Sequence, residues 1–416
     1  MKILYVDLSP GLGGSLVGLE QLLRGLDRAA CEPVVLLAAR NPASDHLRTL
    51  GVPVMTVPAF TVDTARSTAL VRRVKGTAFG QRLSGAPAGG RGSSLLWVWL
   101  RAGRNVATRT LPLTWRLYRA IRAVRPDVVH INDAVFLNRP AIAAAWLAGA
   151  PVICHVRSLR PFEFWDRVWA RTVRRFVFIS RWVADDQVAQ GIPAAKGRLI
   201  HNGVDLARYA RLPDRQSARG ALGLPVDRPI VAVLGRLVAW KGQDLFLHAM
   251  RRVVDAVPNA LGLIVGETEV YSRDFGPRLQ ALAAELALGE AVRFTGYQAD
   301  VPTVLAAIDV LAHTSVAPEP FGRTMVEAMA AGRPVVAPAE GGCLDIVVDG
   351  VTGLLYKPRD PEALAQAIVR LLRDPQMAET MGAAGRTRAT GLFTQERYVS
   401  AVAGLYGELK GPMQLS

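Results

Sequence analysis

Two carboxylates lie eight positions apart in one run of this sequence. Glu319 precedes an expected helix, and Glu327 lies about one turn inside it. Gly332 stops that helix, so its N-terminus, with free N–H groups and a favourable dipole, falls at 321–324. Carboxylates beside a helix end that binds an anion are electrostatically unfavourable unless they bind hydroxyl groups. Sugars carry hydroxyl groups. For Glu327 taken alone, an ordinary surface charge is an equally open alternative.

Two cations follow another expected strand, Ile230–Leu234. Arg236 comes directly after that strand, within Gly235-Arg236-Leu237, and Lys241 follows five residues later. An arginine fork and a lysine point charge beyond a strand end can together clamp a diphosphate. Two solvated surface cations are the alternative that these residues alone leave open.

A glycine-rich turn follows the first expected strand, Ile3–Val6. It contains Gly11, Gly13 and Gly14 and leads into an apolar helix, so a phosphate could approach its backbone. The spacing matches neither a dinucleotide fingerprint nor a P-loop, and a plain tight turn stays open. His155 ends another expected strand, where a structural role and a ligand-facing role are both open.

Short apolar runs alternate with helical patterns along most of the chain, which predicts parallel sheets covered on both faces. The expected strands are Ile3–Val6, Val34–Ala38, Val128–Ile131, Val152–His155, Phe176–Ile179, Ile230–Leu234, Leu261–Val265, Val292–Phe294, Val310–Ala312 and Pro334–Ala337. The expected helices of the second half are 243–256, 277–288, 323–331 and 361–373. A polar break at 206–228 separates two sets of strands. We therefore predict an α/β fold with two doubly wound, Rossmann-like domains that face a cleft.

Composition excludes several classes of protein. The chain has 416 residues, of which 50% are hydrophobic and 20% charged, so global disorder is excluded. Its longest uncharged apolar stretch, Ala141–Cys154, is shorter than the roughly 18 residues of a membrane span. The start of the chain reads as a strand and is not expected to be a signal peptide. The three cysteines lie far apart, so we expect no disulfide framework, no metal site and a reducing cytoplasm.

Positive charge is concentrated in one segment. The net charge is +15, and residues 60–125 hold thirteen Lys and Arg against a single acid, Asp63. Within it, 60–112 reads as an insertion with a Gly- and Pro-rich turn cluster, followed by Trp97 and Trp99. The next expected helix places its arginines opposite an apolar face; they are Arg116, Arg119, Arg122 and Arg125. Such a surface is suited to phosphate in an anionic membrane or a lipid-pyrophosphate acceptor, and a merely solvated basic face is the alternative.

A series of short motifs follows in order along nearly the whole chain, apart from 60–112. They are Gly13-Gly14, Pro126-Asp127-Val128-Val129-His130, Asn202-Gly203-Val204-Asp205, Gly235-Arg236-Leu237 with Lys241-Gly242, Gly266, Phe294-Thr295-Gly296-Tyr297, Glu319 and Glu327 with Phe321-Gly322, Gly341-Gly342, and Asp349-Gly350-Val351-Thr352-Gly353. Each motif alone is weak, but the ordered set is specific. The chain resembles the retaining GT-B glycosyltransferases of family 4, also called glycosyltransferase group 1.

The resemblance implies a donor site in the C-terminal domain, for a UDP-, GDP- or similar nucleotide sugar. Glu327 would bind the ribose, while Arg236 and Lys241 would bind the diphosphate. Glu319 would hold the hydroxyl groups of the donor sugar, and His155 would face that sugar from the N-terminal domain. The implied donor-binding residues are Gly13, Gly14, Gly296, Tyr297, Phe321, Gly322, Arg323, Thr324 and Glu327. The implied catalytic residues are His155, Glu319, Arg236 and Lys241.

The resemblance also implies the course of the reaction. Fixed cations and the helix end near Gly322 would stabilise the departing diphosphate in place of a metal, so neither a metal nor a cofactor is expected. Retention would follow the front-face, ion-pair route proposed for the family, in which the leaving phosphate accepts the proton of the acceptor. Glycosidase chemistry would need two acids that flank the bond, and we do not interpret Glu319 and Glu327 as such a pair.

The expected organisation has three parts. Residues 1–208 form an acceptor-side domain, residues 209–393 bind the nucleotide sugar, and the helix in 394–416 crosses back to the first domain. The expected acceptor is a lipid-linked or cell-surface glycan precursor of the cell envelope. This places the enzyme in the cytoplasm, peripheral at the inner face of the membrane. The donor sugar, base, acceptor, linkage, pathway and oligomeric state stay open.

Two other classes of function remain as alternatives. Another GT-B enzyme, such as a sugar-nucleotide epimerase or a phosphorylase, is the first; no lysine lies in a pattern suited to a pyridoxal Schiff base. A basic nucleic-acid-binding protein is the second, and it would leave the C-terminal motifs without a role. We therefore expect no nucleic-acid partner.

Overall fold

The computed structural model describes residues 1–9, 14–38, 43–57, 110–268 and 272–409. The described chain forms two units. The first is built mainly from Met1–Val177 and Gln190–Lys196, and the second from Phe178–Ala189 and Gly197–Glu408. The functional division into 1–208, 209–393 and 394–416 stays a prediction.

The first sheet has seven strands in the order β3-β2-β1-β4-β5-β6-β7. They are β1 (Lys2–Asp7), β2 (Glu32–Ala38), β3 (Val54–Val57), β4 (Val128–Ile131), β5 (Val152–Val156), β6 (Arg175–Phe178) and β7 (Gly197–Leu199). The strands from β3 to β5 pair in parallel. The continuous apolar run Ile3–Val6 is fully buried, as expected of a central strand with helices on both faces.

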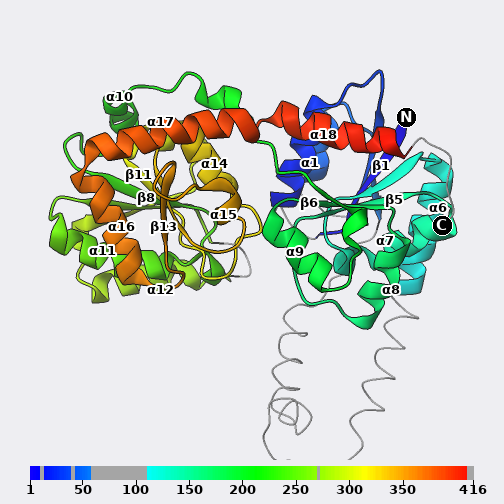
Figure 1. The fold of residues 1–416 in the computed structure, drawn as a ribbon, viewed down its shortest axis with the longest axis horizontal. Coiled ribbons are helices and arrows are strands. Elements are labelled where there is room, and N and C mark those ends of the chain that lie inside the picture. The colour runs from blue at the N-terminus through cyan, green and yellow to red at the C-terminus, as the bar shows by residue number, and fades with distance from the viewer. Residues whose placement is uncertain (10–13, 39–42, 58–109, 269–271, 410–416) are drawn as a thin grey trace, which may run out of the picture. The chain divides into compact units, whose positions relative to one another are not determined.

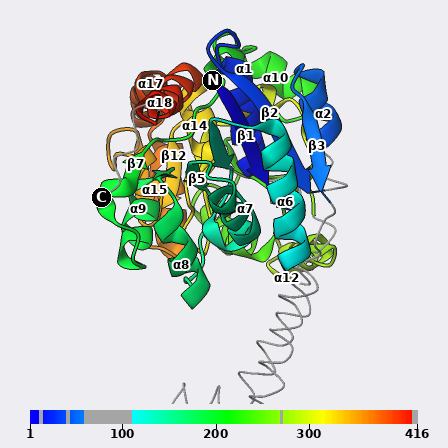
Figure 2. The same ribbon diagram turned by 90° about the vertical axis from the view of Figure 1, so that its right-hand side faces the viewer.

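The helices that accompany this sheet are α1 (Gly14–Gly25), α2 (Ala43–Thr49), α6 (Leu111–Val124), α7 (Val135–Leu147), α8 (Phe164–Thr172) and α9 (Arg181–Ala189). Helix α6 packs along α7 (Figure 2). Its apolar face is buried through Leu113, Leu117 and Ile121. Its arginines lie on the exposed side, as predicted; they are Arg116, Arg119, Arg122 and Arg125. The rest of the basic segment, with Trp97 and Trp99, lies outside the described residues.

The second sheet has six strands in the order β10-β9-β8-β11-β12-β13, and every neighbouring pair is parallel. They are β8 (Ile230–Leu234), β9 (Leu261–Val265), β10 (Val292–Gly296), β11 (Val310–Ala312), β12 (Val335–Pro338) and β13 (Gly353–Tyr356). One face packs on a cluster of buried side chains that includes Phe246, Met250 and Ile264. Figure 1 shows this sheet between two layers of helices.

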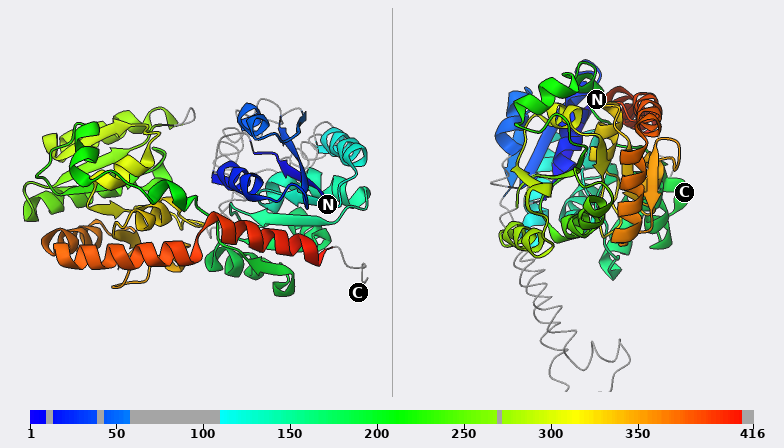
Figure 3. Two further views of the ribbon diagram at one scale, coloured as in Figure 1. Left: turned by 90° about the horizontal axis from the view of Figure 1, so that it is seen from above. Right: turned by 90° about the vertical axis from the view of Figure 1, so that its left-hand side faces the viewer.

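The helices of this half are α10 (Arg215–Ala221), α11 (Gln243–Ala256), α12 (Phe275–Glu285), α13 (Val301–Ala307), α14 (Arg323–Ala330), α15 (Cys343–Ile346), α16 (Pro361–Arg373), α17 (Pro375–Leu392) and α18 (Gln395–Glu408). Figure 3 shows α17 and α18 as consecutive helices. Four helices begin at an aspartate whose side chain accepts a backbone N–H of the first turn; these caps are Asp214, Asp300, Asp360 and Asp374. Such caps satisfy N–H groups that have no partner within the helix, which fixes where each helix starts.

Most predicted elements are confirmed. The predicted bounds of β4, β8, β9, β11, α11 and α16 match the structure. Three short strands, β3, β7 and β13, were not predicted, and the expected connector 206–228 contains α10. That interpretation of the connector missed Asp214, whose cap starts the helix.

Close packing of α14 against α17 depends on Gly382, which is buried within α17. A Cβ atom at Gly382 would lie 2.1 Å from the carbonyl oxygen of Gly332, whereas a Cβ at Gly391 of the same helix has open space around it. We expect Gly382→Ala to lower the free energy of unfolding by ~2 kcal/mol through overpacking. Gly391→Ala, the matched control, should raise it by up to ~1 kcal/mol through helix propensity. Thermal unfolding of both variants checks this, and equal melting temperatures would contradict it.

Candidate functional site

The strand order of each sheet reverses at one point, between β1 and β4 in the first sheet and between β8 and β11 in the second. Ligands of open α/β sheets bind outside the carboxyl ends of the strands at such points. In the second unit, a ligand is therefore expected near the residues that follow β8 and β11. In the first unit, it is expected near the residues that end β1, β4 and β5.

Three glycines end β8, β9 and β10 at this edge of the second sheet. Gly235, Gly266 and Gly296 all have positive φ, at 152°, 139° and 69°. The N–H of Gly235 donates to the carbonyl of Val265 (3.0 Å), and the N–H of Gly266 donates to the carbonyl of Gly296 (2.9 Å). A Cβ at Gly266 would lie 2.0 Å from the carbonyl oxygen of Gly235, so the neighbouring turns can approach this closely only without a side chain there.

The predicted diphosphate clamp lies in the turn between β8 and α11. Arg236 is exposed, and its carbonyl accepts a hydrogen bond from Gln243 (2.9 Å). The carbonyl of Lys241 accepts one from the hydroxyl of Thr314 (2.8 Å). Gly242, with φ of 67°, ends this turn. A Cβ atom at Gly242 would lie 2.0 Å from the Thr314 carbonyl oxygen, so the two segments can approach this closely only without a side chain there. The turn after β8 is thereby fixed against the residues that follow β11.

Glu319 is buried and directly contacts Lys241. Lys241 Nζ donates to Glu319 Oε2 (2.6 Å), and Ser315 Oγ donates to the same oxygen (3.0 Å). His313 Nε2 lies 3.3 Å from it. Burial raises the pKa of Glu319, but the Lys241 and His313 side chains outweigh burial and hold it well below its usual range. Glu319 is therefore a fixed carboxylate that can only accept hydrogen bonds.

The backbone from Glu319 to the start of α14 is held by a second pair of glycines. The N–H of Gly342 donates to the Glu319 carbonyl (2.7 Å), and a Cβ at Gly341 would lie 2.8 Å from that oxygen. Phe321 is buried, and Gly322 is the N-cap of α14 with φ of 102°. The loop that leads from Glu319 to the first turn of α14, at Arg323 and Thr324, is thereby held in place.

Glu327 is half-buried on α14 and lies 3.9 Å from Arg323, measured from Oε1 to Nη2. Burial raises the pKa of Glu327, and the charges of Arg323 and Arg208 oppose that rise. Arg323 also donates to the carbonyl of Gly203 (3.3 Å). A carboxylate in this position suits hydroxyl donors, which is compatible with its predicted role.

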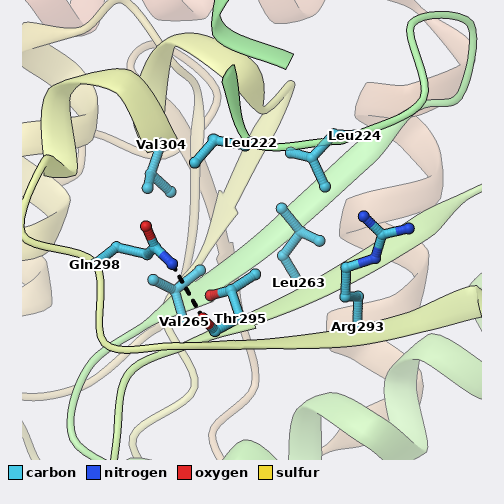
Figure 4. Close-up of a pocket in the computed structure, with 8 residues that line it drawn as sticks. All are labelled: Leu222, Leu224, Leu263, Val265, Arg293, Thr295, Gln298 and Val304. Atoms are coloured by element: carbon cyan, nitrogen blue, oxygen red, sulfur yellow. Dashed lines mark hydrogen bonds between the residues drawn. The ribbon is translucent and has the colours of Figure 1, made fainter. Parts of the chain in front are cut away.

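The segment predicted to meet the base follows β10. Tyr297 is 67% exposed, and its N–H donates to Glu267 Oε1 (3.4 Å). A mostly apolar pocket lies beside this segment (Figure 4), lined by Leu222, Leu224, Leu263, Val265, Arg293, Thr295, Gln298 and Val304. Gln298 turns back to the carbonyl of Thr295 (3.0 Å). None of the predicted donor-binding residues lines this pocket.

In the first unit, Gly13 lies outside the described residues, and Gly14 is exposed at the start of α1. A buried polar network spans the ends of β1 and β4. Asp7 Oδ2 accepts a hydrogen bond from Asn132 Nδ2 (2.8 Å), which also donates to the Ser15 carbonyl in α1 (3.0 Å). Burial raises the pKa of Asp7, and hydrogen bonds from Ser9 and Asn132 oppose this.

His155 lies within β5 and is fully buried. Its ring centroid lies 5.5 Å from that of His130, and its Nδ1 lies 3.3 Å from Arg157 Nη2. Burial lowers the pKa of His155 well below its ordinary value, and the positive charge of Arg157 lowers it further. His155 is therefore a neutral imidazole. Its role opposite the sugar stays a prediction.

Sequence reasoning placed Lys241, Glu319 and the start of α14 in one site, and the structure brings them together. It missed the partners that fix them, His313 and Ser315, and in the first unit it missed Asp7 and Arg157. It also missed Asp133, just beyond β4, where Ser158 Oγ donates to Asp133 Oδ1 (2.7 Å). Burial and the charge of Asp7 raise the pKa of Asp133 to about 6. Their position in the sequence is the signal that could have identified them, since all of these residues end strands or follow strand ends.

The family model for group 1 glycosyl transferases matches residues 214–388. The model for glycosyltransferase family 4 matches residues 84–208. Together the two models cover most of the chain, in the order predicted from the motifs. The chain belongs to the group 1 glycosyltransferases.

Curated relatives match this group 1 chain over about half of their own length. A GDP-mannose-dependent alpha-(1-6)-phosphatidylinositol monomannoside mannosyltransferase of Mycolicibacterium smegmatis is 36% identical over 218 residues, which are 50% of this chain and 56% of that protein. A D-inositol 3-phosphate glycosyltransferase of Salinispora arenicola is 35% identical over 221 residues, which are 50% of this chain and 49% of that protein.

Solved structures extend the similarity over the whole fold. Anabaena HepE in complex with UDP has a TM-score of 0.79 at 25% sequence identity, covering 98% of this chain and 100% of HepE. HepE in complex with UDP-glucose has a TM-score of 0.77 at the same identity and coverage. The predicted α/β fold of the GT-B type, with two doubly wound sheets, is confirmed.

Two features of the described residues bear on membranes and metals. No helix among them is both long and apolar enough to cross a bilayer. The same residues hold no group of three or more His, Cys, Asp or Glu side chains arranged to hold a metal ion. Metal independence stays a prediction.

The contact between Lys241 and Glu319 predicts a stability effect. Lys241→Met leaves the buried Glu319 carboxylate without its cation, which we expect to lower the free energy of unfolding by ~3 kcal/mol. Lys357→Met is the matched control: it removes a lysine that is 80% exposed in its side chain and lies 3.5 Å from Asp360. The control should change stability by under ~0.5 kcal/mol. Chemical denaturation near neutral pH checks both, and similar losses in both would contradict the assignment.

Proposed function

We propose that this chain is a retaining, metal-independent glycosyltransferase that moves a sugar from a UDP- or GDP-sugar to a lipid-linked or cell-surface glycan acceptor. The observation that carries the proposal is the ion pair of Lys241 with the buried carboxylate of Glu319. It lies where the order of the second sheet reverses and directly before the first amides of α14. A cation, a fixed hydrogen-bond acceptor and helix N–H groups are what a diphosphate-linked sugar requires.

The relatives support this choice of substrate. HepE was solved with UDP and with UDP-glucose, and the mycobacterial relative is named for GDP-mannose. A nucleotide sugar is therefore the expected donor, and the base stays open between uracil and guanine.

The charges of the site support a route through the leaving group. Cleavage of the anomeric bond places negative charge on the departing diphosphate. Arg236, Lys241 and the amides at Gly322–Thr324 would stabilise that charge without a metal ion. Glu319 stays ionised, so it cannot serve as the protonated acid that a glycosidase needs. The leaving phosphate would then accept the acceptor's proton.

The other predicted residues keep their proposed roles. Glu327 would bind the ribose hydroxyls, and the backbone at Gly296 and Tyr297 would meet the base. Glu319 and the backbone of Phe321 would hold the donor sugar. His155 would face that sugar from the acceptor-side domain, where Gly13 and Gly14 would approach the diphosphate.

The donor assignment is tested with purified full-length protein. UDP or GDP should raise the melting temperature, and a UDP- or GDP-sugar should transfer its sugar to a lipid acceptor fraction in the presence of EDTA. We expect Arg236→Ala and Lys241→Ala each to lower kcat/KM by ~10² or more, because contacts to a developing anion contribute ~3 kcal/mol. Glu327→Ala should weaken nucleotide binding, whereas Glu319→Ala should chiefly lower transfer.

Lys357→Ala serves as the control for charge removal, and circular dichroism confirms that each variant is folded. Near-wild-type turnover in both Arg236→Ala and Lys241→Ala would overturn the clamp. Activity lost in EDTA and restored only by Mg²⁺ or Mn²⁺ would overturn metal independence.

The proposed acceptor side includes a peripheral contact with an anionic membrane. The arginine face of α6 is exposed, and Trp115 beside it is 60% exposed. Phe164 and Trp165, at the start of α8 in the same unit, are 68% and 56% exposed. Aromatic rings suit the boundary between headgroups and acyl chains, and each arginine near an anionic surface contributes ~1 kcal/mol.

Liposome sedimentation tests this contact. Wild-type protein should sediment with anionic vesicles at low salt and be released in 0.5 M salt, because charge attraction is screened. The triple variant Arg116→Gln, Arg119→Gln and Arg122→Gln should lose most of this binding. The matched triple variant Arg278→Gln, Arg370→Gln and Arg397→Gln removes exposed arginines of the other unit and should keep it. Equal recovery with neutral and anionic vesicles would contradict the proposal.

A further inference from the structure

His155 and Arg157 lie at the end of β5, and both are buried, with exposed fractions of 0% and 7%. Arg157 Nη2 lies 3.3 Å from His155 Nδ1. A guanidinium group offers only N–H donors and stays protonated in proteins. Nδ1 must therefore accept this hydrogen bond, because an N–H at that position would oppose the N–H of the guanidinium group.

A neutral imidazole carries one proton, so a ring that accepts through Nδ1 carries its proton on Nε2. We infer that Arg157 is a positioning residue that fixes His155 as the neutral Nε2–H tautomer. His155 then meets its substrate as a hydrogen-bond donor and takes no part as a base. This inference rests on the proposed function, in which His155 faces the donor sugar.

Arg157 is itself fixed by groups from two other strands and a helix. Its Nε donates to Asn132 Oδ1 (3.2 Å), and Asn132 Nδ2 in turn donates to Asp7 Oδ2 (2.8 Å). A Cβ at Gly18 of α1 would lie 2.4 Å from Arg157 Nη1, so the guanidinium group is packed against the backbone of that helix. The chain of contacts from Asp7 to His155 leaves Arg157 little freedom to turn away from the imidazole.

The surroundings of His155 favour its neutral form. Arg157 faces it from the same strand end, and His130 faces it from β4. The ring of Tyr5 in β1 lies beyond, tilted against His130 with its centroid at 5.1 Å. Burial and the charge of Arg157 lower the pKa of His130 to about 3, so His130 is neutral as well. A protonated His155 would place a second cation beside Arg157. Burial and the charge of Arg157 therefore keep His155 neutral, and the contact with Arg157 selects its tautomer.

Nitrogen NMR of the full-length protein with ¹⁵N-labelled histidine reads the tautomer directly. The chain has six histidines, and the His155 signals are assigned by their loss in His155→Gln. We expect a protonated Nε2 and an unprotonated Nδ1 across about pH 6 to 8. Arg157→Met should give mixed tautomers or a ring that protonates in this range, and Arg157→Lys should restore the Nε2–H form in part. Arg160→Met, which removes the neighbouring arginine over the Phe136 ring, is the control and should change nothing.

Kinetics give the second measurement. Partners that orient metal-bound imidazoles contribute about 10- to 100-fold to activity, and by analogy we expect Arg157→Met to lower kcat by ~10-fold or more. A new acid limb should appear in its pH profile and be absent in Arg157→Lys. A protonated Nδ1 in the wild-type protein would overturn the inference, as would an unchanged His155 spectrum in folded Arg157→Met.

The spectrum of the wild-type protein decides the tautomer even if Arg157→Met does not fold. If the Nε2–H form is found but no sugar is transferred from any UDP- or GDP-sugar, the proposed function fails and the hydrogen-bond assignment stands. If transfer is normal and Nδ1 carries the proton, only the role of Arg157 fails.

Discussion

The ion pair between Lys241 and Glu319 is the contact on which the second unit's site depends. Moving both charges out of water costs several kcal/mol, and the attraction offsets this only where the remaining hydrogen bonds are made. Ser315 makes one of them, at 3.0 Å from Oε2. Because Lys241 follows β8 and Glu319 follows β11, the pair joins two strand ends where the order of the sheet reverses. The pair thereby holds Glu319 shortly before Gly322, the N-cap of α14.

Small residues let the backbone reach the positions that this pair requires. Gly242 lets the turn after β8 lie against the Thr314 carbonyl. Gly341 lets its own segment lie against the main chain of Glu319. An alanine at either position would require a backbone shift, since the nearest atoms are main-chain oxygens at 2.0 and 2.8 Å. These two glycines thus let the backbone hold Lys241 and Glu319 in place.

The sequence predicted strands well where a buried run was long and bounded by turns, as in Ile230–Leu234. The sequence did not predict β13, because this strand is short, lies at the edge of the sheet and follows ordinary turn residues. Within the site, motifs identified Lys241 and Glu319 as separate contacts but not as partners, because they lie 78 positions apart. The link from Asn132 to Asp7 spans 125 positions and has no local signal. Such pairs become visible only once the topology aligns the carboxyl ends of the strands.

The two units use the same edge of a parallel sheet for opposite electrostatic tasks. In the second unit, Lys241 is held as a cation beside an ionised carboxylate, which suits a leaving group that becomes negative. In the first unit, Arg157 is held by Asn132, which also contacts the Asp7 carboxylate, and burial together with the charge of Arg157 keeps His155 neutral. In the proposed reaction the sugar ring becomes positive, so an imidazolium ion facing it would oppose bond cleavage. A neutral N–H donor would orient the same sugar without that repulsion, so in the proposed reaction we expect both the protonation state and the position of His155 to affect the rate.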